Sequence, residues 1–363
     1  MYYKKKNPHG GATEKSIIDF SASVNPLGAP SRVIEAAKEA LDKIDRYPDP
    51  FADDLVKAIA TYEGVPSDYI ICGNGASEII YSYCAAQRPK RALEIAPTFS
   101  EYEEAVRVSG GEMLRYTCEE ENDFLPDDEL FAFLDKESKK IKDENVDCGT
   151  HTVFICNPNN PTGKLYSKEF IEKVLRESKK LGACVFIDEC FMDLSESTWS
   201  SKELLKEHPN LFILKAFTKT FAMPGLRLGY GLCSDEKLLA KMSEITPPWN
   251  ISSVAQAAGI AATRETEYIK KAKELIASER EFLTKELGAL GFKVASSNAN
   301  FILFYDSNDS GLRTQLLQKG IAIRDCANFP GLTEGWYRIA IRNHADNQKL
   351  IDALDSLDTA VLL

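Results

Sequence analysis

Residues 214–232 read L-K-A-F-T-K-T-F-A-M-P-G-L-R-L-G-Y-G-L. In this stretch Lys219 lies between two threonines, shortly after an apolar run at 211–214 that is typical of the end of a buried strand, and Arg227 follows beside a Pro-Gly turn. An amine held in a partly buried pocket has a lowered pKa, so part of it is unprotonated and can form a Schiff base with an aldehyde. The pattern indicates a chemically active lysine, although an isolated T-K-T is more often a surface turn.

Short apolar runs alternate with helical patterns on both sides of this stretch. Helical spacing of apolar residues predicts helices over 31–44, 51–62 and 167–180, and the charged stretch 127–147 reads as a solvated helix and loop. The apolar runs lie at 69–72, 92–95, 152–156, 184–187, 211–214 and 228–232. This alternation predicts an α/β fold with a mainly parallel sheet covered on both faces.

The pattern changes after Pro247. A long helical region over 252–290 is followed by predicted strands near 292–295, 300–304 and 336–341, with helices at 312–319 and 345–357. We therefore predict a large domain over 46–247 and a smaller α+β domain formed by 1–45 and 248–363.

Composition limits the classes of partner. The 44 basic and 55 acidic residues give a net charge of −11, which disfavours nucleic acid or an anionic membrane as the main partner. Nine cysteines without a C-x-x-C pair, and no apolar export or membrane segment, predict a soluble protein of the reducing cytoplasm. The four histidines are far apart, so we predict no metal site.

Two further segments carry groups suited to a charged ligand. Gly73-Asn74-Gly75-Ala76-Ser77 joins a predicted strand to a predicted helix, where backbone N–H groups favour a phosphate, although such a turn alone is a weak signal. Asp188 ends the apolar run C-V-F-I-D-E, so its carboxylate either points into the crevice at the strand ends or caps a helix.

Arginines supply the cationic groups. Arg338 and Arg342 lie four residues apart on a predicted strand, so both face one way, and each is suited to a carboxylate or a phosphate. Surface salt bridging is the alternative for both, above all for Arg342, whose role stays open.

These motifs resemble a known family. The block 218–229 is similar to S/T-K-x-F-A-x-P/A-G-L-R-L-G, the lysine segment of fold type I enzymes that use pyridoxal 5′-phosphate (PLP), in the branch of histidinol-phosphate aminotransferases and threonine-phosphate decarboxylases. C-N-P-N-N-P-T-G at 156–163, otherwise an ordinary rigid turn, is similar to a second motif of that family, and the resemblance covers nearly the whole chain. It implies a large domain with a mainly parallel seven-stranded sheet, a smaller α+β domain and PLP as cofactor.

The resemblance also implies roles for individual residues. Lys219 would be the Schiff-base lysine, and Asp188 would keep the pyridine nitrogen protonated so that the ring acts as an electron sink. The other implied cofactor-binding residues are Gly75, Ala76, Ser77, Thr218 and Arg227 for the phosphate, Asn160 for the 3-oxygen and Phe99 for ring stacking. Tyr47 resembles a tyrosine that reaches the cofactor phosphate of the neighbouring subunit, which implies a homodimer with shared active sites.

Substrate recognition follows from the same resemblance. Arg338 would hold the substrate carboxylate and Arg324 a substrate phosphate. The opening His9-Gly10-Gly11, the segment D-F-S-A-S-V-N-P-L-G at 19–28, which contains Asn25, and R-D-C-A-N-F-P-G-L at 324–332 are closest to the decarboxylases. The implied substrate-binding residues are His9, Gly10, Asn25, Asn160, Arg324 and Arg338.

Two positions depart from the patterns. Phe191 stands where the aminotransferases carry Tyr, so a hydroxyl contact to the cofactor's 3-oxygen is missing, and Ser23 stands where the decarboxylases usually have Asn. The resemblance implies decarboxylation of L-threonine O-3-phosphate, through an external aldimine, to (R)-1-aminopropan-2-yl phosphate for cobalamin synthesis. Histidinol-phosphate aminotransferase is the alternative, and a non-catalytic PLP-binding module is a more remote one. A serine phosphate substrate stays open, because one methyl group changes binding by only about 1–3 kcal/mol.

Overall fold

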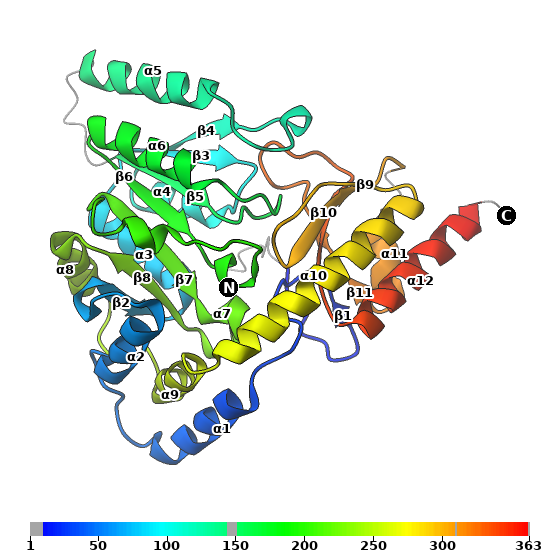
Figure 1. The fold of residues 1–363 in the computed structure, drawn as a ribbon, viewed down its shortest axis with the longest axis horizontal. Helices are drawn as coiled ribbons and strands as arrows, with labels where there is room; N and C mark the ends of the chain where they lie inside the picture. The colour runs from blue at the N-terminus through cyan, green and yellow to red at the C-terminus, as the bar shows by residue number, and fades with distance from the viewer. Residues whose placement is uncertain (1–9, 144–150, 309–310, 362–363) are drawn as a thin grey trace, which may run out of the picture.

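The computed structural model describes residues 10–143, 151–308 and 311–361. A seven-stranded sheet occupies its larger part, in the order β2-β8-β7-β6-β5-β3-β4 (Figure 1). The strands are β2 Ile70–Gly73, β3 Arg91–Ala96, β4 Glu112–Thr117, β5 His151–Cys156, β6 Ala183–Asp188, β7 Leu211–Ala216 and β8 Gly229–Cys233. β8 is antiparallel to both of its neighbours and the remaining pairs are parallel. The mainly parallel seven-stranded sheet predicted from the sequence is confirmed.

Helices cover both faces of this sheet because its strands are apolar on both faces. Phe154 packs in one core cluster and its neighbours Val153 and Ile155 in another, as the side-chain alternation of a strand requires. The first cluster includes α3 Gly75–Gln87, α4 Glu101–Val108 and α8 Glu236–Ile245, and the second includes α2 Asp53–Glu63, α5 Glu129–Asp143, α6 Lys168–Lys180 and α9 Ser253–Ala262.

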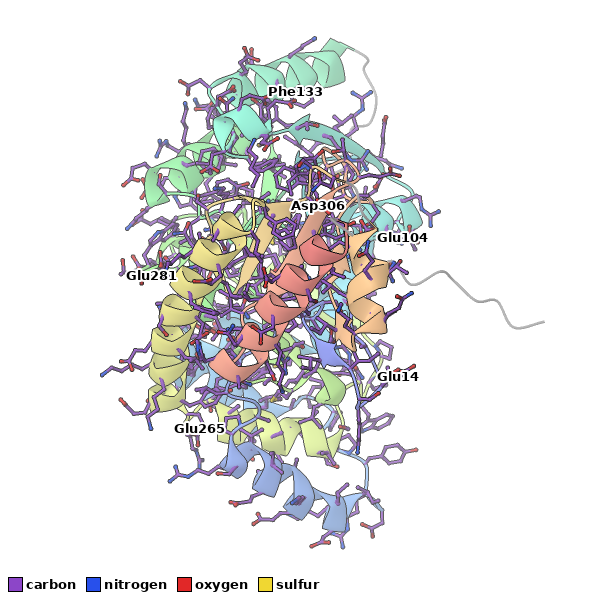
Figure 2. All side chains as sticks on the ribbon, turned by 90° about the vertical axis from the view of Figure 1, so that its right-hand side faces the viewer. Glu14, Glu104, Phe133, Glu265, Glu281 and Asp306 are labelled. Atoms are coloured by element: carbon purple, nitrogen blue, oxygen red, sulfur yellow. The ribbon has the colours of Figure 1, made fainter. Side chains whose placement is uncertain are left out.

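A smaller α+β part lies beside the large sheet. Its antiparallel sheet has the order β12-β13-β10-β9. In addition, β1 near the start of the chain pairs in parallel with β11, about 300 residues later in the sequence. The elements are β1 Ile18–Asp19, β9 Lys293–Val294, β10 Phe301–Tyr305, β11 Ile321–Ala322, β12 Arg324–Asp325, β13 Trp336–Ala340, α10 Thr266–Ala289, α11 Leu312–Gln318 and α12 His344–Val361. Figure 2, seen from the right of Figure 1, shows α10 and α12 side by side in front.

Short helical turns connect these elements. They are α7 Phe217–Thr220 and the 3₁₀ turns η1 Leu41–Lys43, η2 Ser67–Tyr69, η3 Glu120–Asn122, η4 Met192–Leu194, η5 Ser201–Leu204 and η6 Pro224–Leu226. Within the described ranges, no helix has both the length and the apolar character needed to cross a bilayer.

The structure differs from the sequence prediction in three places. The helical region 252–290 is two helices, α9 and α10, because the chain turns between Ala262 and Thr266. The edge strand β4 escaped prediction because its residues are half-exposed and mixed in polarity. Phe51, predicted as the first apolar position of a helix, precedes α2 and is 76% exposed.

The proposed division into domains at residues 46 and 247 stays a prediction. Val33 of α1 (Ser31–Ala40) and Ala255 of α9 share a core cluster with the large sheet, whereas Phe20 packs with Ile276 and Ile339 in the core of the smaller part.

Candidate active site

Most of the candidate functional residues meet at one edge of the large sheet. Cys156 of β5 is the register partner of Asp188 of β6, and Ala216 at the end of β7 is the partner of Gly229 at the start of β8. The loops that leave these strand ends therefore meet above the same edge, where open α/β sheets bind their ligands. The cavity there is lined by Gly10, Ser21, Ala22, Ala76, Ser77, Phe99, Cys156, Asn160, Asp188, Cys190, Phe191, Ala216, Thr218, Lys219, Arg227, Arg324, Phe329 and Arg338.

Lys219 is carried into this cavity by α7, the single helical turn that follows β7. Burial, and next the charge of Arg338, lower the pKa of Lys219 from 10.5 to about 8. Its backbone is fixed from the N-terminal segment: Asn25 N donates to Lys219 O at 3.0 Å and Asn25 Nδ2 donates to Thr220 O at 2.9 Å. A lysine with this pKa exchanges its proton near neutral pH, as the sequence pattern predicts.

Asp188 is a buried carboxylate that accepts hydrogen bonds from Tyr102 and Cys190. The Tyr102 hydroxyl donates to Oδ2 at 2.7 Å and the backbone N–H of Cys190 donates to Oδ1 at 2.9 Å. Burial raises the pKa of Asp188, and the bonds from Cys190 and Tyr102 oppose that rise because they favour the ionised form.

The first turn of α3 forms a corner suited to a phosphate. Gly75 opens the helix with φ +80°, and a Cβ at this position would lie 2.4 Å from Nη2 of Arg227, so only glycine lets the arginine approach. Ala76, Ser77 and Thr218 line the same side of the cavity. Backbone N–H groups of a first helical turn, hydroxyls and one guanidinium are together suited to binding an anion.

Two arginines face the cavity from the smaller part. Arg324 of β12 and Arg338 of β13 are register partners. Arg338 donates to the side-chain oxygen of Asn160 and, at 3.1 Å, to the carbonyl oxygen of Ser21, while its buried Nε has no partner. Arg324 donates to Asn328 Oδ1 at 2.7 Å. Burial lowers the pKa of Arg338 to about 10, which still leaves it cationic at neutral pH, and burial also lowers the pKa of Arg324.

These groups fit PLP as a set. The α3 corner with Arg227 offers an anion site for the phosphate, Lys219 offers an amine for the aldehyde, and the buried carboxylate of Asp188 offers a partner for the pyridine nitrogen. The unpartnered Nε of Arg338 leaves a further donor for an anionic substrate group.

The structure brings most, but not all, of the predicted residues together. Asn25 lies outside the cavity lining, because its amide is used on Thr220 and its Oδ1 accepts from Leu27 N at 3.0 Å. Tyr47 also lies outside it, 82% exposed, with its ring 4.7 Å from that of Trp249. His9 falls outside the described residues. Gly75 does not line the cavity itself but shapes it through Arg227.

The sequence analysis missed Tyr102 as a partner of Asp188. Tyr102 lies on α4, which begins at Glu101, and no local pattern of the sequence links it to a carboxylate 86 residues away. Arg342, unlike Arg338, lies outside the cavity. It pairs with Asp346 at 3.0 Å and donates to Asp19 O at 3.2 Å.

Comparisons with known proteins agree with this geometry. The family model "Aminotransferase class I and II" matches residues 15–354. Threonine-phosphate decarboxylase of Salmonella typhimurium is 33% identical over 353 residues, covering 97% of this chain and 94% of the relative. Histidinol-phosphate aminotransferase of Methanosphaera stadtmanae is 31% identical, covering 96% of this chain and 92% of that one. The crystal structure of histidinol-phosphate aminotransferase from Clostridium acetobutylicum aligns with a TM-score of 0.84 at 33% identity, covering 95% of this chain and all of the other.

Proposed function

The chain belongs to the aminotransferase class I and II family, and from that premise we propose that it decarboxylates L-threonine O-3-phosphate to (R)-1-aminopropan-2-yl phosphate. The cofactor of the family is PLP. In this chain Lys219 would hold its aldehyde carbon, Asp188 its ring nitrogen, and Ser77, Thr218 and Arg227 its phosphate. Asn160 and Phe99 would contact the ring.

The observation that carries the proposal is the arginine pair. Arg324 and Arg338 are register partners on adjacent strands, and both line the cavity that contains Lys219. Two guanidinium groups side by side suit a substrate with two anionic groups, since each can bind a carboxylate or a phosphate through two hydrogen bonds. Threonine phosphate carries both groups, whereas histidinol phosphate carries a phosphate and no carboxylate.

The protein groups then have distinct tasks in the reaction. When bound, PLP supplies an electron sink for the pair left at Cα as CO₂ leaves. Arg338 would bind and orient the departing carboxylate, and Arg324 would anchor the phosphate at the other end. Lys219, with its pKa of about 8, is the cavity group suited to deliver the proton that replaces CO₂ at Cα.

The alternative is transamination of a phosphorylated amine such as histidinol phosphate, because relatives with that name match over almost the whole chain. The test incubates the PLP-loaded protein with L-threonine O-3-phosphate and measures CO₂. In parallel, histidinol phosphate with 2-oxoglutarate is assayed for glutamate. CO₂ without a need for keto acid supports the decarboxylase, whereas glutamate alone overturns it in favour of the aminotransferase.

The role of Arg324 is tested by substrate comparison. Arg324→Gln should reduce kcat/KM for threonine phosphate by about 10- to 100-fold, the value of a charged hydrogen-bonded contact, and leave the slow reaction of unphosphorylated threonine unchanged. Arg342→Gln is the matched control, because this arginine lies outside the cavity. Equal losses for both substrates would contradict a phosphate contact.

A homodimer is part of the proposal. Tyr47, Phe51 and Trp249 expose 82%, 76% and 46% of their surface, and Leu41 and Ile44 expose 52% and 67% nearby in the chain. Exposed apolar side chains gathered in this way mark interaction sites. Sedimentation of the PLP-loaded protein should give twice the monomer mass of 40.4 kDa, and a monomer with full activity would exclude a shared site.

The eight cysteines described are all unpaired, which supports a reducing compartment such as the cytoplasm.

A further inference from the structure

The carboxylate of Asp188 is held from behind by a residue that does not line the cavity. Tyr102 is on α4, fully buried, and its hydroxyl donates to Asp188 Oδ2 at 2.7 Å. Its ring stacks on Phe154 at 5.3 Å and meets the edge of Phe99 at 5.6 Å. Contacts therefore fix both the ring and the hydroxyl, and two of the three partners, Asp188 and Phe99, line the cavity.

We propose that Tyr102 is a positioning residue that, through its hydrogen bond to Oδ2, orients the Asp188 carboxylate and keeps it anionic toward the cofactor ring nitrogen. This inference rests on the proposed placement of the ring against Asp188. Tyr102 would not touch the cofactor itself.

The hydrogen-bond geometry supports an orienting role. Tyr102 donates to Oδ2 of Asp188 and Cys190 N donates to Oδ1, and the Cys190 thiol is a further hydrogen-bonding neighbour of the carboxylate. Two donors at separate oxygens fix the plane of the carboxylate, and each oxygen keeps further acceptor capacity for the cavity. Without Tyr102, one oxygen of a buried carboxylate would lose its protein partner.

Charge supports the second part of the proposal. Burial favours the neutral form of Asp188, and a neutral acid cannot pair with a protonated ring nitrogen. The titratable groups around the carboxylate are Tyr102, Cys156, Cys190 and Lys219. Burial raises the pKa of both thiols, so they stay neutral.

The tyrosine keeps its own proton. Burial, and next the charge of Asp188, raise the pKa of Tyr102 well above its usual value, so the phenol stays a donor throughout the working pH range. The bond is thus an O–H donor on an anion, a type stronger than a bond between neutral groups.

The test uses the holoenzyme loaded with PLP that is ¹⁵N-labelled at the ring nitrogen. Tyr102→Phe removes the hydroxyl and keeps the stacked ring. Loss of a charge-assisted donor should move the pH at which the ¹⁵N resonance reports deprotonation down by about one unit. Tyr83→Phe is the matched control, because Tyr83 is equally buried in the same core and its hydroxyl meets Thr152 at 3.3 Å instead.

An unchanged ¹⁵N titration in a folded Tyr102→Phe holoenzyme, or the same shift in Tyr83→Phe, would overturn the proposal. If Tyr102→Phe does not fold, 3-fluorotyrosine at position 102 replaces it. This residue is a stronger donor and should move the ¹⁵N titration to higher pH, and the absence of an upward shift overturns the proposal.

Asp188→Asn separates the proposed placement of the cofactor from the proposed role of Tyr102. If Asp188→Asn leaves the titration of the ring nitrogen unchanged, the proposed placement of the cofactor is contradicted. If Asp188→Asn changes that titration and Tyr102→Phe does not, only the role of Tyr102 is contradicted.

Discussion

Lys215 and Lys219 lie four residues apart at the end of β7, yet they occupy opposite electrostatic environments. The ammonium of Lys215 lies 3.0 Å from Glu63 and 2.9 Å from Asp193, and it is 3% exposed. Burial alone would lower the pKa of Lys215, but Asp193 and Glu63 outweigh burial and raise it well above its usual value. Lys219 faces the cavity beside Arg338, and its pKa falls to about 8.

The contrast extends to the acids. Asp188 faces the cavity, while the next residue, Glu189, accepts hydrogen bonds from Ser200 and from Ser201 N on the far side of the strand. Glu63 is fully engaged, since Lys202 at 2.8 Å and Tyr230 at 2.5 Å also bind it. On the side away from the cavity, charged groups such as Lys215 and Glu63 pair with each other and stabilise the fold. On the cavity side, Lys219 and Asp188 remain available for a ligand.

The largest effect should come from Lys219→Ala. It removes the proposed cofactor-bonding amine, so turnover should fall by at least about 10³-fold and the visible absorbance of the bound cofactor should disappear. Lys215→Ala, four residues earlier, should keep the visible cofactor absorbance under conditions in which the variant is folded. Full activity of Lys219→Ala would remove the basis of the comparison.

Lys215→Met should be the most destabilising of the lysine variants. It leaves the buried Glu63 and the half-buried Asp193 without their shared cation, which costs about 3–5 kcal/mol in the free energy of unfolding. Urea unfolding measures the change. Lys202→Met should cost less, because the Lys202 side chain is 30% exposed; equal losses would mean that Lys215 is no more tightly paired than its neighbour.

Lys219→Met should have the opposite sign in the protein freed of PLP. The shift from 10.5 to about 8 corresponds to a penalty of about 3 kcal/mol on the folded state at neutral pH, which methionine relieves. Between pH 8 and 10.5 the unfolded lysine binds a proton that the folded one does not, so wild-type stability rises with pH. The advantage of the variant should therefore shrink over that range, and a pH-independent difference would contradict the cause.

The smallest effect should come from Arg342→Gln. Its half-buried ion pair with Asp346 lies outside the cavity, so we expect less than about 1 kcal/mol in unfolding and an unchanged kcat/KM. Arg338→Gln removes a cavity cation four residues earlier, on β13, whereas Arg342 lies beyond the end of that strand; the Arg338 variant should lower kcat/KM by about 10- to 100-fold. Similar kinetic losses in both variants would show that position in the cavity does not separate the two arginines.

Sequence patterns predicted the cavity face far better than the paired face. Asp188 is visible because it ends the apolar run 184–187, and Lys219 because it lies in the block 218–229, which resembles a family motif. The pairing of Lys215 with Glu63 joins residues 152 positions apart, and no local pattern reports such a contact. The same reason applies to Tyr102, whose hydroxyl partner is 86 residues away.

Surface elements were the other weak point. β4 is an edge strand with half-exposed residues, so its pattern lacks the apolar run that revealed the central strands. Phe51 was misplaced because periodicity cannot distinguish an apolar residue that packs inward from one that stays exposed. The final positions of such residues depend on tertiary contacts.

The pairing of β1 with β11 bears on how the protein is made. Ile18 finds its partner Ile321 only after about 300 further residues have been synthesised, which takes roughly 15–60 s at cellular translation rates. During that interval Phe20 lacks the core in which it ends up fully buried, and we expect proteases to cleave near it in nascent chains arrested before residue 321. Because Arg324 and Arg338 of the cavity wall are also synthesised after residue 321, the cofactor can be captured in a complete cavity only by a chain that is almost finished.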